Sequence, residues 1–238
     1  MRGLAWAAAS ASLALACGGA PPVATPASPP SGPAVVDAPP PSGAPVAPAT
    51  VEDHAFWTWI AAHVGDLRAI TRGDEPIMDE LAARLRAVDP GLAFEVGVGT
   101  APFELIISAD GVRDKFPVVQ RLVAAAPPIT GLEPIAFRPR KSADFGIRIE
   151  GIELGAGDVW FTATPAGATL DVVLYVRGLD GTRDDVRKYA TYVLLDTLLG
   201  EYDVETRLGG IEWRAAPTAP AAPLRPLTEL PAEVDRLK

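Results

Sequence analysis

Carboxylates are the most plentiful acid–base groups in this chain. Its 238 residues include 30 Asp and Glu but only two His and one Cys. Two carboxylates placed on either side of a glycosidic bond can hydrolyse it, and the candidates near expected turns or helix ends are Asp110, Asp114, Asp180, Asp184, Asp185, Asp196 and Glu201. Turns and helix N-termini also favour Asp and Glu for structural reasons. We therefore expect structural roles for these residues, with hydrolysis as the alternative.

Other catalytic and metal-binding patterns are sparse. His54 and His63 are nine positions apart, so they do not form the i, i+4 pair that places two ligands on one helix face. The chain has no Gly-x-Ser-x-Gly elbow. A scattered Ser-His-Asp set stays open, with these two histidines as its only bases. The sequence predicts no metal and no cofactor, and it favours binding over catalysis.

The single cysteine follows a short apolar segment at the N-terminus. After Met1-Arg2-Gly3, Leu4 to Ala16 is uncharged; this stretch of about 13 residues has the length of a signal-peptide core and is too short to span a bilayer. Leu13-Ala14-Leu15-Ala16-Cys17 resembles the lipobox of bacterial lipoproteins. The resemblance implies cleavage before Cys17, lipidation of Cys17 and a stable acyl anchor. The alternatives are an ordinary signal peptide with an incidental cysteine and a free thiol in a secreted protein.

The residue after the cysteine and the net charge bear on location and partners. Gly18, rather than Asp, resembles the sorting pattern of outer-membrane lipoproteins. This implies a lipid-anchored protein of the cell envelope, on the outer membrane facing the periplasm if the host has two membranes; a host with one membrane stays open. The formal net charge of −9 argues against nucleic acid as a partner and against electrostatic docking to anionic lipid. The expected membrane contact is therefore the lipid on Cys17.

Composition divides the chain into four segments. We expect a signal peptide at 1–16, a lipidated cysteine with a Pro/Ala-rich disordered linker at 17–50, a globular α+β domain at 51–216, and a Pro-rich tail with a short terminal helix at 217–238. The linker lacks large apolar side chains that could offset its ordering entropy. Extended as polyproline II, it would reach about 100 Å. A tether is the favoured role, and a ligand for an aromatic groove is the alternative.

Hydrophobic periodicity predicts the elements of the globular domain. Helical spacing predicts two opening helices, the first capped by Thr50 and the second starting near Asp74 and Pro76. Alternation of apolar residues predicts a hairpin at 94–107 and later strands. The remaining elements are expected as a helix from about 116, a strand at 135–137, strands at 147–154, 159–164 and 170–177, a helix at 183–199 and a strand at 211–214. We expect a two-layer α+β sandwich, a mostly antiparallel sheet with helices packed on one face.

Two passages share the same plan. Phe103 to Arg140 and Leu170 to Arg214 each run as strand, Asp-Gly turn, helix and strand. They end in Phe137-Arg138 and Trp213-Arg214, respectively. The pattern indicates either two degenerate strand-helix-strand repeats or a chance similarity between two common units.

Several fragments of the domain resemble an uncharacterised bacterial protein family of unknown function. The fragments are Phe56-Trp57-Thr58-Trp59, Ile107-Ser108-Ala109-Asp110-Gly111, Leu122-Val123-Ala124-Ala125-Ala126-Pro127, Ala136-Phe137-Arg138-Pro139-Arg140 and Leu195-Asp196-Thr197-Leu198-Leu199-Gly200-Glu201. They span essentially the whole globular domain. The resemblance implies domain boundaries near those given above, and it implies no activity, cofactor or catalytic residue.

Two features are candidate binding residues. Trp57 flanks the apolar stripe of the first helix, so its ring could be an exposed interaction anchor, with core packing as the alternative. Arg138, Arg140 and Lys141 gather positive charge at a strand end of an acidic protein. They could hold an anionic ligand or a partner's carboxylate, and pairing with local acids is the alternative.

The sequence therefore favours a membrane-tethered envelope lipoprotein whose domain binds another envelope protein without catalysing a reaction. One alternative is a carboxylate-dependent hydrolase acting on envelope polymers. It would need a concave pocket with two carboxylates and no basic partners nearby. The other alternative is a structural spacer, which a broad exposed apolar patch would argue against.

Overall fold

A computed structural model describes residues 46–73, 75–143 and 145–237. The predicted signal peptide, the predicted lipidation site Cys17, most of the linker and the predicted cap Asp74 lie outside these residues. Within them, none of the helices combines the length and apolar character needed to cross a bilayer. The described chain is an α+β fold, as the sequence predicts.

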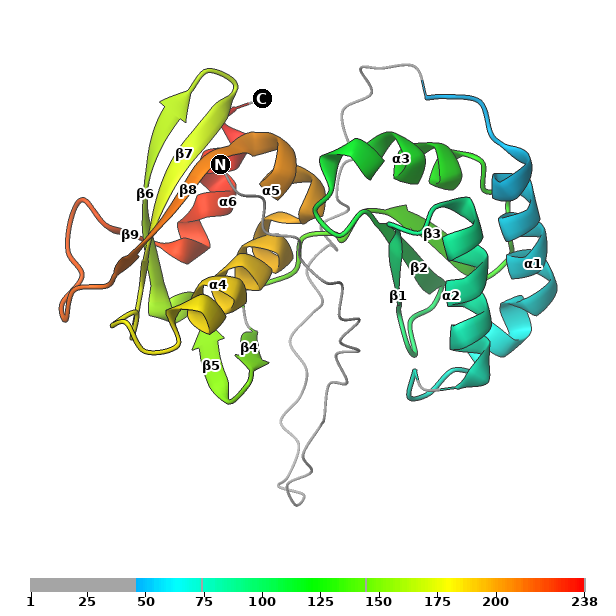
Figure 1. The fold of residues 1–238 in the computed structure, drawn as a ribbon, viewed down its shortest axis with the longest axis horizontal. Helices are drawn as coiled ribbons and strands as arrows, with labels where there is room; N and C mark the ends of the chain where they lie inside the picture. The colour runs from blue at the N-terminus through cyan, green and yellow to red at the C-terminus, as the bar shows by residue number, and fades with distance from the viewer. Residues whose placement is uncertain (1–45, 74, 144, 238) are drawn as a thin grey trace, which may run out of the picture.

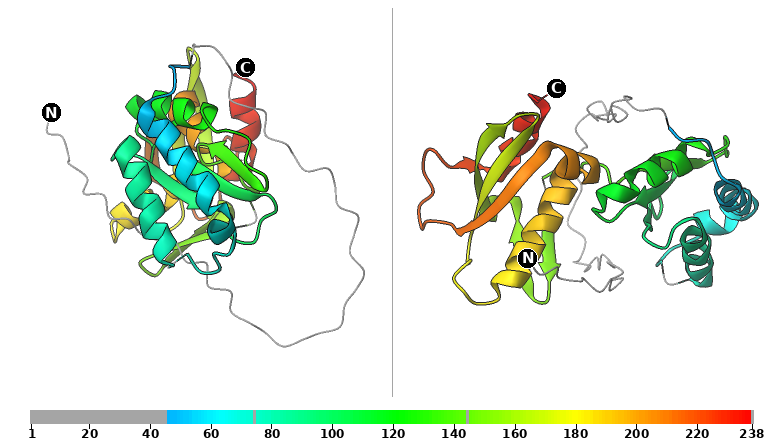
Figure 2. Two further views of the ribbon diagram at one scale, coloured as in Figure 1. Left: turned by 90° about the vertical axis from the view of Figure 1, so that its right-hand side faces the viewer. Right: turned by 45° about the horizontal axis from the view of Figure 1, so that its top comes forward.

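The first described elements are the two predicted helices, α1 (Val51–Arg68) and α2 (Pro76–Val88). Thr50 caps α1 through a reciprocal pair of hydrogen bonds. The Asp53 amide donates to the Thr50 hydroxyl over 3.2 Å, and the Thr50 amide donates to the Asp53 carboxylate over 2.8 Å. The two helices lie side by side at one end of the molecule (Figure 2).

A three-stranded sheet follows and confirms the predicted hairpin. Strands β1 and β2 pair antiparallel, and β3 pairs parallel to β2 after a helical crossover. The elements are β1 (Ala93–Val96), β2 (Phe103–Ser108), the short helix η1 (Arg113–Lys115), α3 (Phe116–Ala124) and β3 (Leu132–Ala136). Their buried apolar residues form one core with those of α1 and α2.

The second half of the described chain builds a hairpin, a four-stranded sheet and three helices. The sheet order is β8-β7-β6-β9, with β7 and β8 parallel and the other pairs antiparallel. The elements are β4 (Gly146–Ile149), β5 (Ile152–Gly155), η2 (Ala156–Asp158), β6 (Val159–Ala166), β7 (Thr169–Val176), α4 (Asp184–Leu199), α5 (Glu201–Arg207), β8 (Leu208–Ala215), β9 (Arg225–Pro226), η3 (Leu227–Glu229) and α6 (Leu230–Asp235).

The described residues have two hydrophobic cores, where the sequence predicts one domain. One core joins α1, α2 and α3 to the β1–β3 sheet, and the other joins α4, α5 and α6 to the β6–β9 sheet and the β4–β5 hairpin. We call residues 51–137 the first lobe and residues 145–237 the second lobe (Figure 1). Each sheet is covered by helices from its own lobe, so each lobe buries its own apolar surface.

The two predicted repeats have the same topology in the structure. In both, an antiparallel hairpin leads through a helical crossover to a strand parallel to the preceding one: β1-β2-α3-β3 in the first lobe and β6-β7-α4-α5-β8 in the second. The described strands form three sheets rather than the single sheet expected. The physical reason is that each unit packs its own helices and closes its own core.

The C-terminal segment packs into the second lobe. Leu227, Leu230 and Val234 are fully buried in its core, and β9 pairs with β6. The sequence sets residues 217–238 apart as a tail, whereas their apolar residues complete the helical layer on the β6–β9 sheet. The expected short terminal helix is α6.

Candidate functional site

The chain crosses between the lobes at residues 137–141, and this crossing lies against the corner between α4 and α5. The Lys141 amide donates to the Thr197 carbonyl over 2.8 Å, and the Glu201 amide donates to the Arg138 carbonyl over 3.0 Å. Figure 1 shows α5 and the start of α3 meeting at this point between the lobes. We call the contacts around residues 137–141 the junction.

A buried carboxylate lies at the centre of the junction. Glu201 has no exposed surface. Its Oε1 accepts hydrogen bonds from the Ala109 amide at 2.9 Å and the Gly111 amide at 3.2 Å, and its Oε2 accepts one from the Arg138 amide at 3.2 Å. The second lobe thus satisfies three backbone donors of the first lobe and the crossing. Glu201 has a structural role here, because both of its oxygens are occupied and no surface is open to a substrate.

Gly200 makes this close approach feasible. Its φ is +78°, a left-handed conformation that favours glycine. A Cβ at this position would lie 3.1 Å from the Arg138 carbonyl oxygen and 3.2 Å from the Arg140 amide nitrogen. The helix predicted at 183–199 ends just before Gly200, and α5 begins directly after this glycine.

Arg138 gathers three acidic side chains around the junction. Its guanidinium contacts Glu95 at 2.6 Å, Asp110 at 3.0 Å and Asp196 at 3.7 Å. Burial raises the pKa of Asp196 to about 7; Arg138 lowers this pKa, while Glu201 and the other nearby acids raise it. Three of the candidate carboxylates, those of residues 110, 196 and 201, therefore come together, but around an arginine.

Arg140 and Lys141 differ in their surroundings. The Arg140 guanidinium donates to the Leu199 carbonyl at 2.9 Å and pairs with Asp203 and Asp235. Lys141 is exposed. Arg138 and Arg140 are thus engaged by acids of the same chain, which agrees with the local-pairing interpretation and leaves little of either guanidinium for an anionic ligand.

Trp57 is a core residue rather than an exposed anchor. Its side chain is 1% exposed, and its indole Nε1 donates to the Leu122 carbonyl over 2.7 Å. Phe56 packs edge-on against it, with ring centroids 5.1 Å apart. The indole therefore has its polar atom satisfied inside the first lobe, as the core alternative requires.

Two of the remaining candidate carboxylates, Asp180 and Asp184, have local roles. The Gly181 amide donates to Asp184 over 3.0 Å, and the Thr182 amide donates to Asp180 over 3.0 Å. Both contacts are the turn and helix-start bonds that the sequence suggests. Within the described residues, no group of three or more His, Cys, Asp and Glu side chains is arranged to hold a metal ion.

A surface hollow of the second lobe contains two further carboxylates. It is lined by residues of β5 and of the loops after β5 and β7, including Glu153 and Asp158. Asp158 pairs with Arg177 at 3.2 Å, and Glu153 pairs with Arg148 at 2.7 Å. The carboxylates here have basic partners, so this hollow does not match the arrangement that the hydrolase alternative needs.

The β6–β9 sheet has one face that its helices leave open. In the described part of the second lobe, α4, α5 and α6 lie on one side of the sheet, and the loop between β8 and β9 extends on the other side (Figure 1). The buried residues of β6 and β7 point to the helical side, including Phe161, Leu174 and Val176. The alternate residues of these strands are half-buried or exposed and point to the opposite side, which we call the open face.

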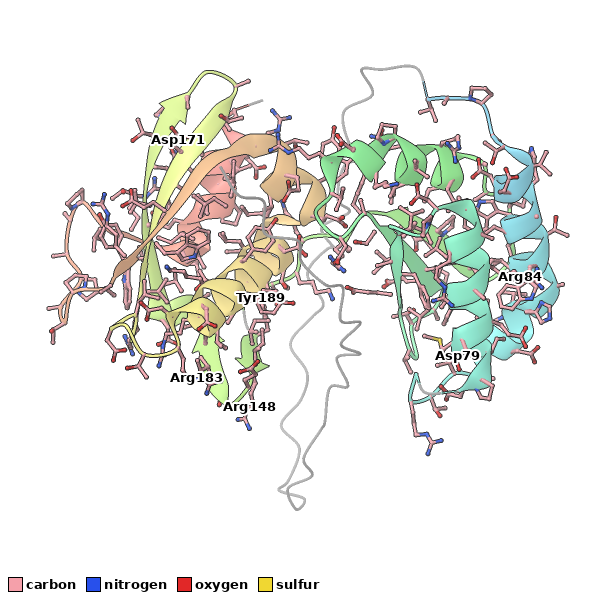
Figure 3. All side chains as sticks on the ribbon, viewed as in Figure 1. Asp79, Arg84, Arg148, Asp171, Arg183 and Tyr189 are labelled. Carbon is pink, nitrogen blue, oxygen red and sulfur yellow. The ribbon has the colours of Figure 1, made fainter. Side chains whose placement is uncertain are left out.

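Two aromatic side chains lie next to each other on the open face. Trp160 of β6 is directly opposite Tyr175 of β7, and Thr162 is opposite Val173. The Arg177 guanidinium lies 5.5 Å from the centroid of the Trp160 ring, a cation–π distance. Asp171, labelled in Figure 3, lies near the start of β7, at the opposite end of this strand from Tyr175.

Sequence reasoning missed the open face and the partners of Glu201, although it favours a structural role for that residue. The sequence signal for the open face is the alternation of residues along β7. Every second residue of β7 is apolar and lies on the buried face, which leaves Val173 and Tyr175 on the other face. Glu201 carries no comparable signal. Its partners lie up to 92 positions earlier in the chain.

Comparisons with known proteins give no relative. No protein-family model, no curated protein and no solved structure matches this chain. The resemblance of its fragments to an uncharacterised bacterial family therefore stays an expectation, and functional inference depends on the geometry described above.

Proposed function

We propose that this protein is a lipid-anchored binding protein of the cell envelope, tethered through Cys17 and its Pro/Ala-rich linker. Its open face binds an envelope protein. The observation that carries the proposal is the pair of aromatic residues, Trp160 and Tyr175, on a sheet face that no helix of the described chain covers.

The composition of the open face suits a protein partner. Interface centres are enriched in Trp, Tyr and Arg, and a few such residues supply most of the binding energy. Trp160, Tyr175 and Arg177 lie together here. A partner that covers Trp160 and Tyr175 would remove the remaining exposed area of two large rings from water.

The lipid anchor is supported by the lipobox resemblance at Cys17, and the anchored protein faces the periplasm if the host has two membranes. The carboxylate-dependent hydrolase is less well supported, because the acids at the junction and in the surface hollow contact arginines. A structural spacer is also less well supported, because a spacer does not require aromatic residues on an uncovered sheet face.

A crosslinking pull-down from envelope fractions tests the proposal. It compares the native chain with Tyr175→Asp, which places a charge on the open face, and with Cys17→Ser, which removes the anchor. Tyr189→Asp is the matched control, because Tyr189 is 53% exposed on α4, away from the open face. Each variant is first shown to keep its native circular dichroism spectrum.

We expect the native chain and Tyr189→Asp to enrich the same few proteins, and Tyr175→Asp to lose them. Loss with Cys17→Ser as well would support positioning by the lipid. Equal enrichment by Tyr175→Asp and the native chain would refute the open face as the binding surface. Copurification of cell-wall fragments without a protein partner would favour the hydrolase.

A further inference from the structure

Strand β8 forms one edge of the second sheet. The sheet order is β8-β7-β6-β9, so β8 has β7 on one side and no strand of the described chain on the other. It is also eight residues long, whereas β9 at the opposite edge has only two. A long edge strand presents a row of backbone donors and acceptors that can pair with another strand.

The pairing with β7 identifies which backbone groups point to the free edge. The Ala216 amide donates to the Val176 carbonyl over 3.0 Å, and Val176 is the register partner of Ala215. Backbone groups alternate in direction along a strand. The amide and carbonyl groups of Ile211, Trp213 and Ala215 therefore point away from β7.

The side chains of β8 alternate as well. Ile211 and Trp213 pack against the core of the second lobe. Glu212 and Arg214 lie on the opposite face with 57% and 52% of their side chains exposed, and within one copy they pair with each other at 2.8 Å. The free edge thus carries one acid and one base, two positions apart.

We propose that two copies of this chain associate by pairing their β8 strands antiparallel, centred on Trp213. In this register the outward backbone groups of Trp213 meet those of Trp213 in the second copy, and Ile211 meets Ala215. Each of these is a hydrogen-bonded pair. The two sheets then form one continuous sheet across the two-fold axis, an isologous interface.

Charge selects this register among those that the backbone allows. Centring on Trp213 places Glu212 of each copy directly opposite Arg214 of the other. These are non-hydrogen-bonded pairs, in which opposing side chains are closest. Centring on Glu212 or Arg214 would place identical charges opposite each other, which is unfavourable. The charge pattern of the strand is therefore complementary to itself in one register.

Sedimentation equilibrium tests the proposal on the full mature chain, residues 17–238, with Cys17→Ser so that lipid cannot drive association. We expect a monomer–dimer equilibrium with a dissociation constant below about 100 µM, a modest affinity that suits a small interface. Glu212→Lys and Arg214→Glu each place like charges opposite each other. We expect each variant alone to raise the dissociation constant at least tenfold.

Mixing the two variants supplies the rescue. One copy then carries two basic side chains and the other two acidic ones, so we expect a heterodimer with nearly native affinity. Both substitutions are on exposed side chains, and circular dichroism is used to check that each variant is folded. A native chain that stays monomeric, or single variants that dimerise as well as the native chain, would overturn the proposal.

Disulfide crosslinking tests the register itself. In a mixture of Glu212→Cys and Arg214→Cys copies, the two thiols are directly opposite, and the other cross-strand pair keeps its native Glu and Arg. We expect rapid oxidation to a covalent dimer. Each variant alone places its two thiols on a diagonal about 7–8 Å apart and should oxidise slowly. Equal crosslinking in all three samples would exclude the register centred on Trp213.

The outcome is independent of the proposed partner. Trp160→Asp alters the open face on β6, which β7 separates from β8, whereas Glu212→Lys alters the β8 edge. Tyr175 is the register partner of Arg214, so Tyr175→Asp is not used in this comparison. Loss of self-association without loss of the pulled-down proteins would support both proposals as separate surfaces. A monomeric native chain would refute the dimer and leave the open face to its own test.

Discussion

Replacing Glu201 by glutamine should destabilise the protein strongly, although the side chain keeps its size. Glu201 is fully buried and accepts three backbone hydrogen bonds, all within 3.2 Å. The amide of Glu201→Gln can keep its oxygen on the Ala109 and Gly111 amides. Its NH2 group then faces the Arg138 amide, so one charge-assisted bond is lost and a buried donor has no acceptor.

The expected loss is about 2–4 kcal/mol, because hydrogen bonds to charged groups contribute about 1.5–3 kcal/mol and a buried unsatisfied group costs about 1–3 kcal/mol. For a chain of this length, each kcal/mol shifts Tm by roughly 2–4 °C. We therefore expect Glu201→Gln to lower Tm by about 5–15 °C. Thermal and urea unfolding followed by circular dichroism measure the change.

Glu133→Gln is the matched control for this experiment. Glu133 is exposed on β3, so the same chemical change there should alter stability by no more than about 0.5 kcal/mol. If Glu201→Gln melts within 1–2 °C of this control, the three hydrogen bonds do not hold the lobes together as described. The reasoning about the junction would then be wrong.

Two further predictions follow from buried groups. Burial gives Asp196 a pKa of about 7, above its ordinary value of 3.8, so the folded state binds this proton more tightly than the unfolded state does. The stabilisation that results from this proton is present below about pH 4 and is lost as pH rises through 7. Asp196→Asn should therefore flatten the decline in Tm between pH 5 and 8, and an unchanged slope would contradict the role of burial. Trp57→Phe removes the buried hydrogen bond to the Leu122 carbonyl and should lower the free energy of unfolding, measured in urea, by about 2–3 kcal/mol. The proteins enriched in the pull-down should be the same as for the native chain. Unchanged stability would contradict a core position.

Local signals predict much of the fold. Thr50 with Asp53, and Pro76 at a helix start, place α1 and α2. Period-two alternation places β1, β2, β6 and β7. The stretch 147–154 is expected as one strand but turns at Glu150 and Gly151, which both have positive φ. Nothing in the apolar pattern marks that turn, because Ile147 and Leu154 still face the same core.

The junction could not be predicted because its contacts are distant in sequence. Arg138 reaches Glu95 across 43 positions, and Arg140 reaches Asp235 across 95. Sequence alone shows a run of basic residues and leaves the choice between an anion site and local pairing open. The choice depends on where two lobes with separate cores meet, which neither periodicity nor composition specifies.

Each lobe consists of contiguous residues, and this has a consequence for synthesis. A chain that emerges from its N-terminus can close the β1–β3 sheet and most of the first core before any residue beyond 137 is made. Glu201 arrives late, and with it come the acceptors for Ala109, Gly111 and Arg138. The last third of the polypeptide therefore joins the second lobe to a first lobe that is already folded.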